Sequence, residues 1–268
     1  MTSLLNGRTV MVTGSSTGIG RAIAIQLASQ GAKVILHGRT DSDSIRSVAQ
    51  EISKIGSEST TLLSDFTRIE SWDDFVDQAW SWQGEVDCWI NNAGGDVLTG
   101  DWANRDLEEK LIYLLQVDVA ATLMLSKRAG ERMKNSSDAS NGKSAGAKSI
   151  INIGWDQAWQ GMGGVSGELF STTKGAIMSM TKSLAQSYAP EVRVNCIAPG
   201  WIQTKWGEQA SEEWDERAKR ESLMKRWGTP DDVANVAAFL CSDQASFVSG
   251  QVLPVNGGFE FGPSTLHP

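Results

Sequence analysis

The chain has 268 residues, of which 40% are hydrophobic, so it can bury one sizeable core, and a single α/β domain of this length is ordinary. Its formal net charge of −8 at pH 7 argues against a surface that binds nucleic acid or an anionic membrane. Any phosphate site must therefore be local rather than a product of overall charge.

The cysteines and histidines indicate the compartment of the protein and whether it has a metal site. Cys88, Cys196 and Cys241 lie far apart in the sequence without a CxxC pair, which is typical of buried thiols in a reducing compartment. His37 and His267 belong to no metal-binding pattern, so we expect no metal site. The first ten residues lack the features of a signal peptide, and no stretch is long enough to span a membrane. We expect a cytoplasmic protein.

Short apolar, β-branched runs alternate with helical patterns along the whole chain. The predicted strands are 8–13, 33–37, 59–64, 86–91, 148–153, 192–197 and 250–255. The predicted helices are 18–30, 41–55, 71–83, 105–134, 169–189 and 230–241. Continuous apolar runs suit strands buried on both faces of a parallel sheet. The alternation predicts one doubly wound sheet, with its ligand at the carboxyl ends of the strands.

Two segments do not fit this alternation. Residues 135–147 are poor in apolar residues and rich in Ser, Gly and Asn, which indicates a flexible surface loop rather than a functional segment. Residues 208–224 form a charged helical pattern, and we expect the region near 201–228 to cover the substrate as a lid. No domain boundary is visible, so residues 1–268 are read as one domain.

The first predicted strand runs into the sequence TGSSTGIG at 13–20, and a helical pattern follows at once. Glycines let the backbone turn tightly and approach a pyrophosphate, which then sits on the helix N-terminus. A glycine-rich turn alone is weak evidence, because such turns are common. The residues expected to contact the cofactor here are Gly14, Ser16, Thr17, Gly18 and Ile19.

Three further elements agree with a dinucleotide site. Asp65 follows the third strand, where a carboxylate can accept a hydrogen bond from the adenine amino group. The fourth strand ends in NNAG at 91–94, whose small residues let a cofactor pass close to the backbone. The run PGWIQT at 199–204 follows the sixth strand. The predicted contacts from the last two elements are Asn92, Ala93, Gly94, Pro199, Gly200, Ile202 and Thr204.

With these motifs in this order, the chain resembles the short-chain dehydrogenase/reductase family. The resemblance runs from about residue 7 to 258 and includes the late run Asn256-Gly257-Gly258. It implies a Rossmann-type α/β fold, a doubly wound parallel sheet of about seven strands with helices on both faces. It also implies a small-molecule substrate and assembly as a homodimer or homotetramer.

The end of the second strand favours NADP(H) over NAD(H). An acidic residue there would bind the adenosine ribose hydroxyls and repel a 2′-phosphate. This chain has Gly38, Arg39 and Thr40 instead. Glycine leaves room, and the guanidinium of Arg39 suits a phosphate bidentately. The alternative is that Arg39 is an ordinary solvated arginine.

The resemblance also assigns four catalytic positions, and three of them depart from the family pattern. In the family, a Tyr-x-x-x-Lys pair shares one helix face, the lysine lowers the phenol pKa and binds the nicotinamide ribose, and the tyrosine exchanges a proton with substrate. Lys174 is present, but the tyrosine position is Phe170. The carbonyl-polarising serine is replaced by Trp155, and the asparagine of the preceding helix by Asp118.

Few residues can replace the missing acid. Asp156 is the best remaining titratable group in the loop after strand five, although the sequence favours a turn-forming aspartate over a catalytic one. Glu168 is a weaker candidate. The only tyrosines, Tyr113 and Tyr188, are interpreted as packing or surface residues. We expect Asp118 to pair with Lys174, which holds the ribose even if no proton moves.

Eleven tryptophans are many for this length. The segments that cover the substrate in the resembled family contain Trp155, Trp159, Trp201, Trp206, Trp214 and Trp227. One interpretation is a wide aromatic cleft for a flat or apolar ligand, and the other is packing of the lid and of subunits.

Three functions remain open from the sequence. The first is a reductase or dehydrogenase that transfers hydride without the usual acid, to or from a substrate that needs little proton assistance. The second is a non-catalytic NADP(H)-binding subunit or sensor. The third is a non-redox lyase or isomerase that uses bound cofactor.

Overall fold

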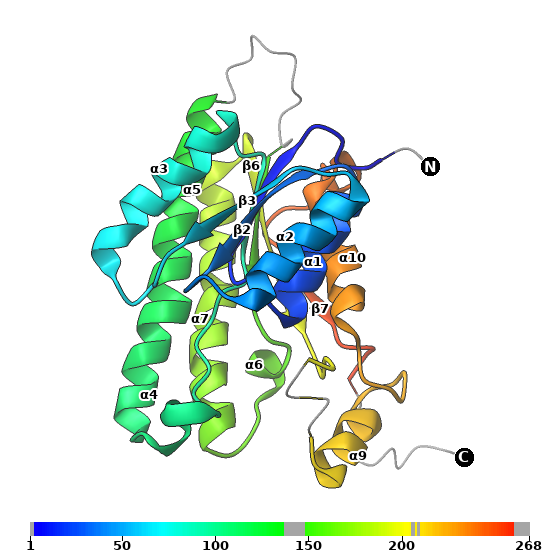
Figure 1. Cartoon of the computed structure of the whole chain (residues 1–268). Coiled ribbons are helices and arrows are strands. Elements are labelled where there is room, and N and C mark those ends of the chain that lie inside the picture. Colours follow the sequence, from blue (N-terminus) through cyan, green and yellow to red (C-terminus); the bar gives the residue numbers. More distant parts are fainter. Residues whose placement is uncertain (1–2, 137–147, 205–206, 208–209, 260–268) are drawn as a thin grey trace.

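The computed structural model describes residues 3–136, 148–204, 207 and 210–259, and they form one parallel sheet covered by helices on both faces (Figure 1). The strands lie in the order β3-β2-β1-β4-β5-β6-β7. Their bounds are β1 Thr9–Val12, β2 Lys33–Gly38, β3 Ser59–Leu63, β4 Cys88–Asn91, β5 Lys148–Ile153, β6 Val192–Pro199 and β7 Val252–Val255. The predicted fold class is confirmed.

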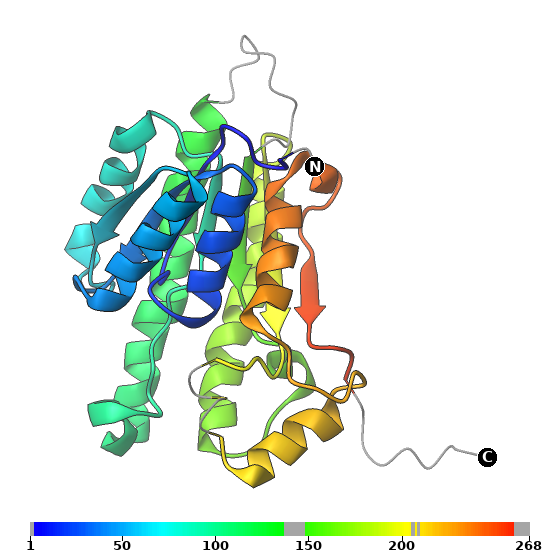
Figure 2. The same cartoon turned by 45° about the vertical axis from the view of Figure 1, so that its right-hand side comes forward.

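Alternation along the strands divides the core between the two faces of the sheet. In β1, Val10 and Val12 pack on one side and Met11 on the other. The first face is covered by α1 Gly18–Ser29, α2 Asp43–Ile55 and α10 Pro230–Cys241, with α1 beside α10 in both views (Figures 1 and 2). The second face is covered by α3 Trp72–Gln83, α5 Ala121–Ser136 and α7 Val165–Tyr188.

Most predicted helices agree with the structure to within two residues, and two differ more. The helix predicted over 105–134 is divided into α4 Leu107–Leu114, a π-helical turn at Leu115–Ala120, and α5. Helix α7 begins four residues before its predicted start at 169. Of the predicted loop 135–147, residues 135 and 136 belong to the end of α5, and the rest lie outside the described residues.

Two helices lie beyond the carboxyl ends of the strands. They are α6 Gln157–Gln160 and α9 Glu212–Glu221, and Figure 2 shows α9 at the end of the molecule toward which the strand arrowheads point. Short 3-10 turns at Ile69–Ser71, Gly100–Asn104 and Asp243–Ala245 complete the elements. No helix among the described residues is long and apolar enough to cross a membrane.

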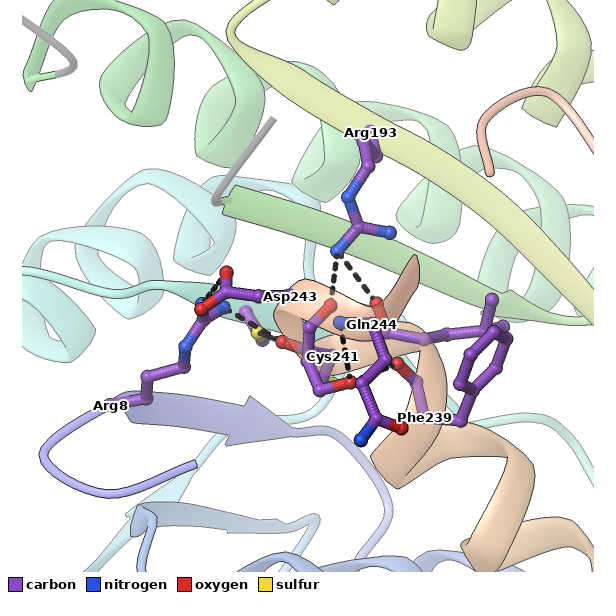
Figure 3. Close-up of polar contacts among 9 residues, drawn as sticks. Arg8, Arg193, Phe239, Cys241, Asp243 and Gln244 are labelled. Atoms are coloured by element: carbon purple, nitrogen blue, oxygen red, sulfur yellow. Dashed lines mark hydrogen bonds and ion pairs between the residues drawn. The ribbon is translucent and has the colours of Figure 1, made fainter. Parts of the chain in front are cut away.

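Two arginines fix the opposite end of the sheet by binding the last carbonyl groups of α10 (Figure 3). Arg8 Nη1 donates to the Cys241 carbonyl oxygen at 2.8 Å. Arg193 Nη2 donates to the Leu240 carbonyl oxygen at 2.8 Å, and burial lowers the pKa of its guanidinium. Cationic donors at a helix C-terminus satisfy carbonyl groups that lack helical partners. These contacts hold the last turn of α10 at this end of the sheet, and the two cavities described below lie at the carboxyl ends of the strands.

Candidate cofactor and substrate site

The turn after β1 and the first turn of α1 each have one position that accepts only glycine. Gly14 has φ of 62°, and a Cβ there would lie 2.8 Å from the Ala93 Cα. A Cβ on Gly20 would lie 2.2 Å from the Gly14 carbonyl oxygen and 2.4 Å from Asn92 Nδ2. The first turn of α1 therefore packs directly on the turn after β1 and the loop after β4.

Hydrogen bonds join these two loops into one unit. Thr13 Oγ1 accepts from the backbone N–H of Asn92 at 2.9 Å and of Ala93 at 3.0 Å. Asn92 Nδ2 donates in return to the carbonyl oxygens of Thr13 and Gly14, at 3.0 and 2.9 Å. The two motifs that carried the family resemblance are thus in direct contact.

The side chain of His37 holds the glycine turn by a hydrogen bond to its backbone, a role that the sequence analysis missed. The Gly14 N–H donates to His37 Nδ1 at 3.0 Å, and Nε2 lies 3.0 Å from the Ser64 carbonyl oxygen. Because Nδ1 accepts, the ring is neutral and Nε2 donates. Burial lowers the pKa of His37 to about 4, and the ring stacks on Phe66 at 4.4 Å. No sequence motif marks a histidine inside a strand as a loop support.

The turn opens onto a cavity of about 830 Å³ at the carboxyl ends of the strands. Ten of the residues predicted for cofactor binding line it: Gly14, Ser16, Thr17, Ile19, Arg39, Asp65, Asn92, Ala93, Gly94 and Thr204. Arg39 is exposed at its rim. A glycine turn at a helix N-terminus, small residues opposite it, and a carboxylate and an arginine beyond them fit a dinucleotide.

An aromatic wall of this cavity was not predicted. Tyr113, interpreted from the sequence as a packing or surface residue, lines the cavity and stacks on Trp102 with ring centroids 4.1 Å apart. Arg105 lies over Trp102 at 5.9 Å. Tyr113 reaches the cavity because the backbone of Gly95 leaves room for its ring. Tyr188 does pack in the core, as expected, and donates to the Lys127 carbonyl oxygen at 3.1 Å.

A second cavity, of about 530 Å³, adjoins the first. Ile19, Asn92 and Thr204 line both cavities, so the two meet there. Lys174 and three other predicted cofactor residues, Pro199, Gly200 and Ile202, line the second cavity. Gly18 lines neither, and faces the side chain of Thr204.

Lys174 forms an ion pair with Asp118 at the edge of the second cavity. Its Nζ lies 2.9 Å from Asp118 Oδ2, and Asp118 Oδ1 accepts from the Gly95 N–H at 2.7 Å. Asp118 is 1% exposed and lies in the π-helical turn, a feature often found at functional sites. A Cβ on Gly94 would lie 3.2 Å from the carboxylate, so the cofactor motif passes directly beside this pair.

Phe170 and Trp155 lie edge to face beside each other on the wall of the second cavity. Their ring centroids are 6.3 Å apart with an interplanar angle of 76°, and both rings line the cavity. The Phe170 side chain lies one helical turn from Lys174 on α7. The described structure thus brings an aromatic pair together where the resembled family has a phenol and a hydroxyl.

The two acidic candidates lie elsewhere. Asp156 is 3% exposed but is not among the residues that line the cavity, and its Oδ2 accepts from Asn256 Nδ2 at 3.0 Å. Burial raises the pKa of Asp156 to about 6. Glu168 is exposed and is also absent from the cavity wall. Neither carboxyl group belongs to the wall of the second cavity.

The tryptophans divide into two groups. Trp155, Trp201, Trp214 and Trp227 line the second cavity, and α9 supplies Trp214. Trp159 is 60% exposed and outside the cavity, with Lys182 over its ring at 5.9 Å. Trp206 lies outside the described residues. Of the predicted lid, the described part supplies one wall of the cavity.

The described residues contain no group of three His, Cys, Asp or Glu side chains that could hold a metal ion. Cys88, Cys196 and Cys241 are buried, free thiols.

A doubly wound parallel sheet, a glycine turn between β1 and α1, and a cavity at the strand carboxyl ends define a dinucleotide-binding protein of the Rossmann type. Comparison with known proteins gives the family. The family described as Enoyl-(Acyl carrier protein) reductase matches residues 14–260. The chain belongs to the short-chain dehydrogenase/reductase family. The relatives named below are oxidoreductases.

Three relatives show the level of similarity. The 3-oxoacyl-[acyl-carrier-protein] reductase of Aquifex aeolicus is 34% identical over 258 residues, covering 95% of this chain and 98% of its own. The crystal structure of a 3-oxoacyl (acyl-carrier-protein) reductase from Agrobacterium tumefaciens C58 with NADP bound has a TM-score of 0.82 at 29% identity, covering 96% of each chain. A 7α-hydroxysteroid dehydrogenase complexed with NADH and 7-oxo glycochenodeoxycholic acid has a TM-score of 0.83 at 29% identity, covering 96% of each chain.

Proposed function

We propose that the protein is an NADP(H)-dependent oxidoreductase that transfers hydride between the cofactor and a small molecule held in the aromatic cavity. The observation that carries the proposal is the junction of the two cavities at Ile19, Asn92 and Thr204. A dinucleotide along the first cavity reaches the second there, where Lys174 lies on the wall. The bound cofactor supplies or accepts the hydride.

The residues of the first cavity would hold the cofactor in a defined order. The N-terminal turn of α1 offers Ser16, Thr17 and backbone N–H groups to the pyrophosphate. Asp65 stands where it can accept from the adenine amino group, and Lys174 where it can bind a ribose hydroxyl. We assign the preference for NADP(H) to Arg39, because its guanidinium lies at the rim with no carboxylate in the place that usually excludes a 2′-phosphate.

The absent acid restricts the chemistry. Phe170 cannot donate a proton and Trp155 offers no hydroxyl to a carbonyl oxygen, while the charge of Lys174 is balanced by Asp118. Losing a positioned general acid costs roughly 10²–10⁴-fold in rate. The preferred substrate therefore needs little proton assistance, and simple ketones are poor substrates.

A second function, a non-catalytic NADP(H)-binding subunit or sensor, is favoured by the same aromatic pair. Rings at both proton-handling positions are what a protein would carry if it bound the cofactor without turning it over. The cavity of about 530 Å³ beside the pair favours the oxidoreductase, because a sensor has no need of it.

Further parts of the proposal concern partners and setting. The cavity wall suits a flat or apolar substrate, with the region near 201–228 acting as a lid. We propose a homodimer or homotetramer, and a cytoplasmic setting that keeps the three buried thiols reduced.

A thermal-shift titration tests cofactor binding. NADPH at 100 times its dissociation constant adds about 2.7 kcal/mol of stability, or roughly 5–10 °C in a domain of this size. The shift should be larger with NADPH than with NADH, and Arg39→Ala should remove the difference. Arg46→Ala is the matched control, since Arg46 pairs with Asp41 and Asp43 and does not line the cavity. No shift with millimolar NADPH rejects the proposal, and a larger shift with NADH rejects the role of Arg39.

A further inference from the structure

Aromatic side chains are five of the 17 residues that line the second cavity, which the proposed function assigns to the substrate: Trp155, Phe170, Trp201, Trp214 and Trp227. The rings contact one another, with centroids of Trp201 and Trp214 at 5.5 Å and of Trp201 and Trp227 at 5.9 Å. A wall of π-systems offers a negative quadrupole to whatever the cavity holds.

The indole N–H groups of two of these rings are bound by carboxylates. Trp201 Nε1 donates to Glu221 Oε2 at 2.9 Å, and Trp227 Nε1 donates to Asp215 Oδ1 at 2.9 Å. Both acceptors lie on α9. Donating to a carboxylate increases the electron density of an indole ring, and it removes that N–H as a donor for a ligand. These rings are therefore suited to contact a cation rather than a carbonyl oxygen.

The same rings already bind a cation of the protein. Arg217 Cζ lies 5.6 Å from the centroid of Trp201 and 5.1 Å from that of Trp214. Arg217 is not among the residues that line the cavity, and its Nε lies 2.7 Å from Glu221 Oε1. The rings of Trp201 and Trp214 therefore already make a cation–π contact with a guanidinium of α9. Among the described residues, Trp155 and Phe170 have no cation over their rings.

Lys174 does not make the cavity electropositive. It is the one cationic side chain among the described residues of the wall, and Asp118 lies 2.9 Å from its Nζ. A cationic ligand thus meets a compensated ion pair and five rings. A carbonyl substrate, in contrast, would develop an alkoxide beside Trp155 and Phe170, and neither side chain offers the hydroxyl that the resembled family uses there.

We propose that the cavity binds a flat organic cation, and that the substrate is an iminium ion with a carbon–nitrogen double bond. The inference rests on the proposed oxidoreductase function and names its substrate class. Reduction moves one hydride, with its electron pair, from a reduced nicotinamide dinucleotide to the iminium carbon. The π electron pair of the double bond becomes the nitrogen lone pair, and the products are a neutral amine and the oxidised dinucleotide. No proton is transferred, so the chain needs neither the phenol nor the hydroxyl that it lacks.

Binding is tested first on the protein without cofactor, by calorimetry. The probe is N,N-dimethyl-tetrahydroisoquinolinium, a quaternary cation with no reducible bond, and the neutral reference is α-tetralone, a ketone of similar size and shape. We expect the cation to bind at least 10-fold more tightly. Trp155→Leu should weaken the cation about 10-fold and α-tetralone less than 3-fold, because it removes one cation–π contact.

The matched control is Trp159→Leu, since Trp159 is exposed and outside the cavity, and it should change neither affinity. Trp155→Phe keeps an aromatic face and should restore most of the affinity for the cation, which separates the ring's electrostatic role from loss of folding. Equal or tighter binding of α-tetralone by the unmodified protein overturns the proposal.

Turnover is tested next with N-methyl-dihydroisoquinolinium and NADPH, with the non-enzymatic rate subtracted. We expect NADPH oxidation with the iminium, none above background with α-tetralone, and a loss of about 10-fold in kcat/KM for Trp155→Leu. If NADPH shifts the melting temperature and the cation binds, but the iminium is not reduced, the substrate assignment is wrong. If NADPH does not bind at all, the proposed function fails instead, while cation binding is decided by the calorimetry alone.

Discussion

The ligand site has a cofactor half, at the first cavity, and a substrate half, at the second. The two halves differ in how many of the polar side chains expected from the family resemblance they contain. In the cofactor half, Thr13, Asn92 and His37 hold the glycine turn with direct hydrogen bonds, and the glycines fit contacts that no other residue tolerates. In the substrate half, Phe170 and Trp155 stand where proton transfer is expected. In the proposed function, a dinucleotide site supported by these hydrogen bonds adjoins a catalytic corner that is occupied by aromatic rings.

Under the proposed function, this difference implies that cofactor binding and proton transfer are separable within one fold. Cofactor binding depends on backbone geometry at the ends of β1 and β4, which the whole sheet supports. Proton handling depends on side chains of α7 and of the loop after β5, which can change without disturbing the sheet. The Asp118–Lys174 ion pair lies where the cofactor half meets the substrate half. Variants of this pair therefore report how strongly the two halves depend on each other.

The largest effect is expected when that ion pair loses its cation. Lys174→Met leaves the carboxylate of Asp118, 1% exposed, without its partner, and breaking a buried pair from one side costs about 3–5 kcal/mol. Chemical denaturation should show this loss. The double variant Lys174→Met with Asp118→Asn should recover most of it, because no buried charge remains. A single variant as stable as the unmodified protein would show that the pair is not buried in solution.

The second effect is a pair of opposite pH dependences, one from His37 in the cofactor half and one from Asp156, which is buried outside the substrate cavity. His37 has its pKa lowered from 6.5 to about 4, so the unfolded chain binds a proton that the folded chain does not. Its contribution to stability is complete above pH 6.5 and is lost as the pH falls toward 4, on the order of 3 kcal/mol. Asp156 has its pKa raised from 3.8 to about 6, so its contribution is complete below pH 3.8 and is lost as the pH rises through 6.

The two contributions nearly cancel between about pH 4 and 6 in the unmodified protein. Asp156→Asn should expose the His37 dependence, so that stability rises with pH over this range more steeply than in the unmodified protein. His37→Gln should expose the opposite slope. Denaturation midpoints of the three proteins at several pH values measure both, and parallel curves would refute the assignments.

A smaller effect is expected in the cofactor half from one added methyl group. Gly20→Ala places a Cβ 2.2 Å from the Gly14 carbonyl oxygen, and such overpacking costs typically about 1–3 kcal/mol. It should also weaken NADPH binding, because the turn must move. Gly175→Ala is the control, since the added methyl group on α7 meets nothing within 4 Å and should leave stability unchanged or slightly raised. If the two variants had equal stability and equal affinity for NADPH, the turn would accommodate the added methyl group without cost.

Much of the cofactor half was predictable from sequence, because its motifs are local. The run TGSSTGIG and the run NNAG each occupy a few consecutive residues at strand ends, and the parallel sheet brings strand ends together. Tyr113 does pack against its neighbours, but its place on the cavity wall was not predicted, because it depends on the path of the loop from Gly95 to Trp102, which no periodic pattern reports.

The continuous helix expected over 105–134 contains a π-helical turn for a similar reason. Its apolar periodicity does not show the extra residue per turn that places Asp118 under Lys174. The identities of Phe170 and Trp155 were visible in the sequence, but their edge contact and the orientation of Trp201 and Trp227 toward α9 required the fold.

The most direct test of the central claim is steady-state reduction of small ketones by NADPH. The unmodified protein should bind NADPH and show essentially no turnover of these ketones. The double variant Phe170→Tyr with Trp155→Ser, which restores a phenol four residues from Lys174 and a hydroxyl in place of the indole, should turn them over measurably faster. Turnover by the unmodified protein at ordinary enzymatic rates, on the order of 1–10³ per second, would contradict the account, because it would show that another group supplies the proton.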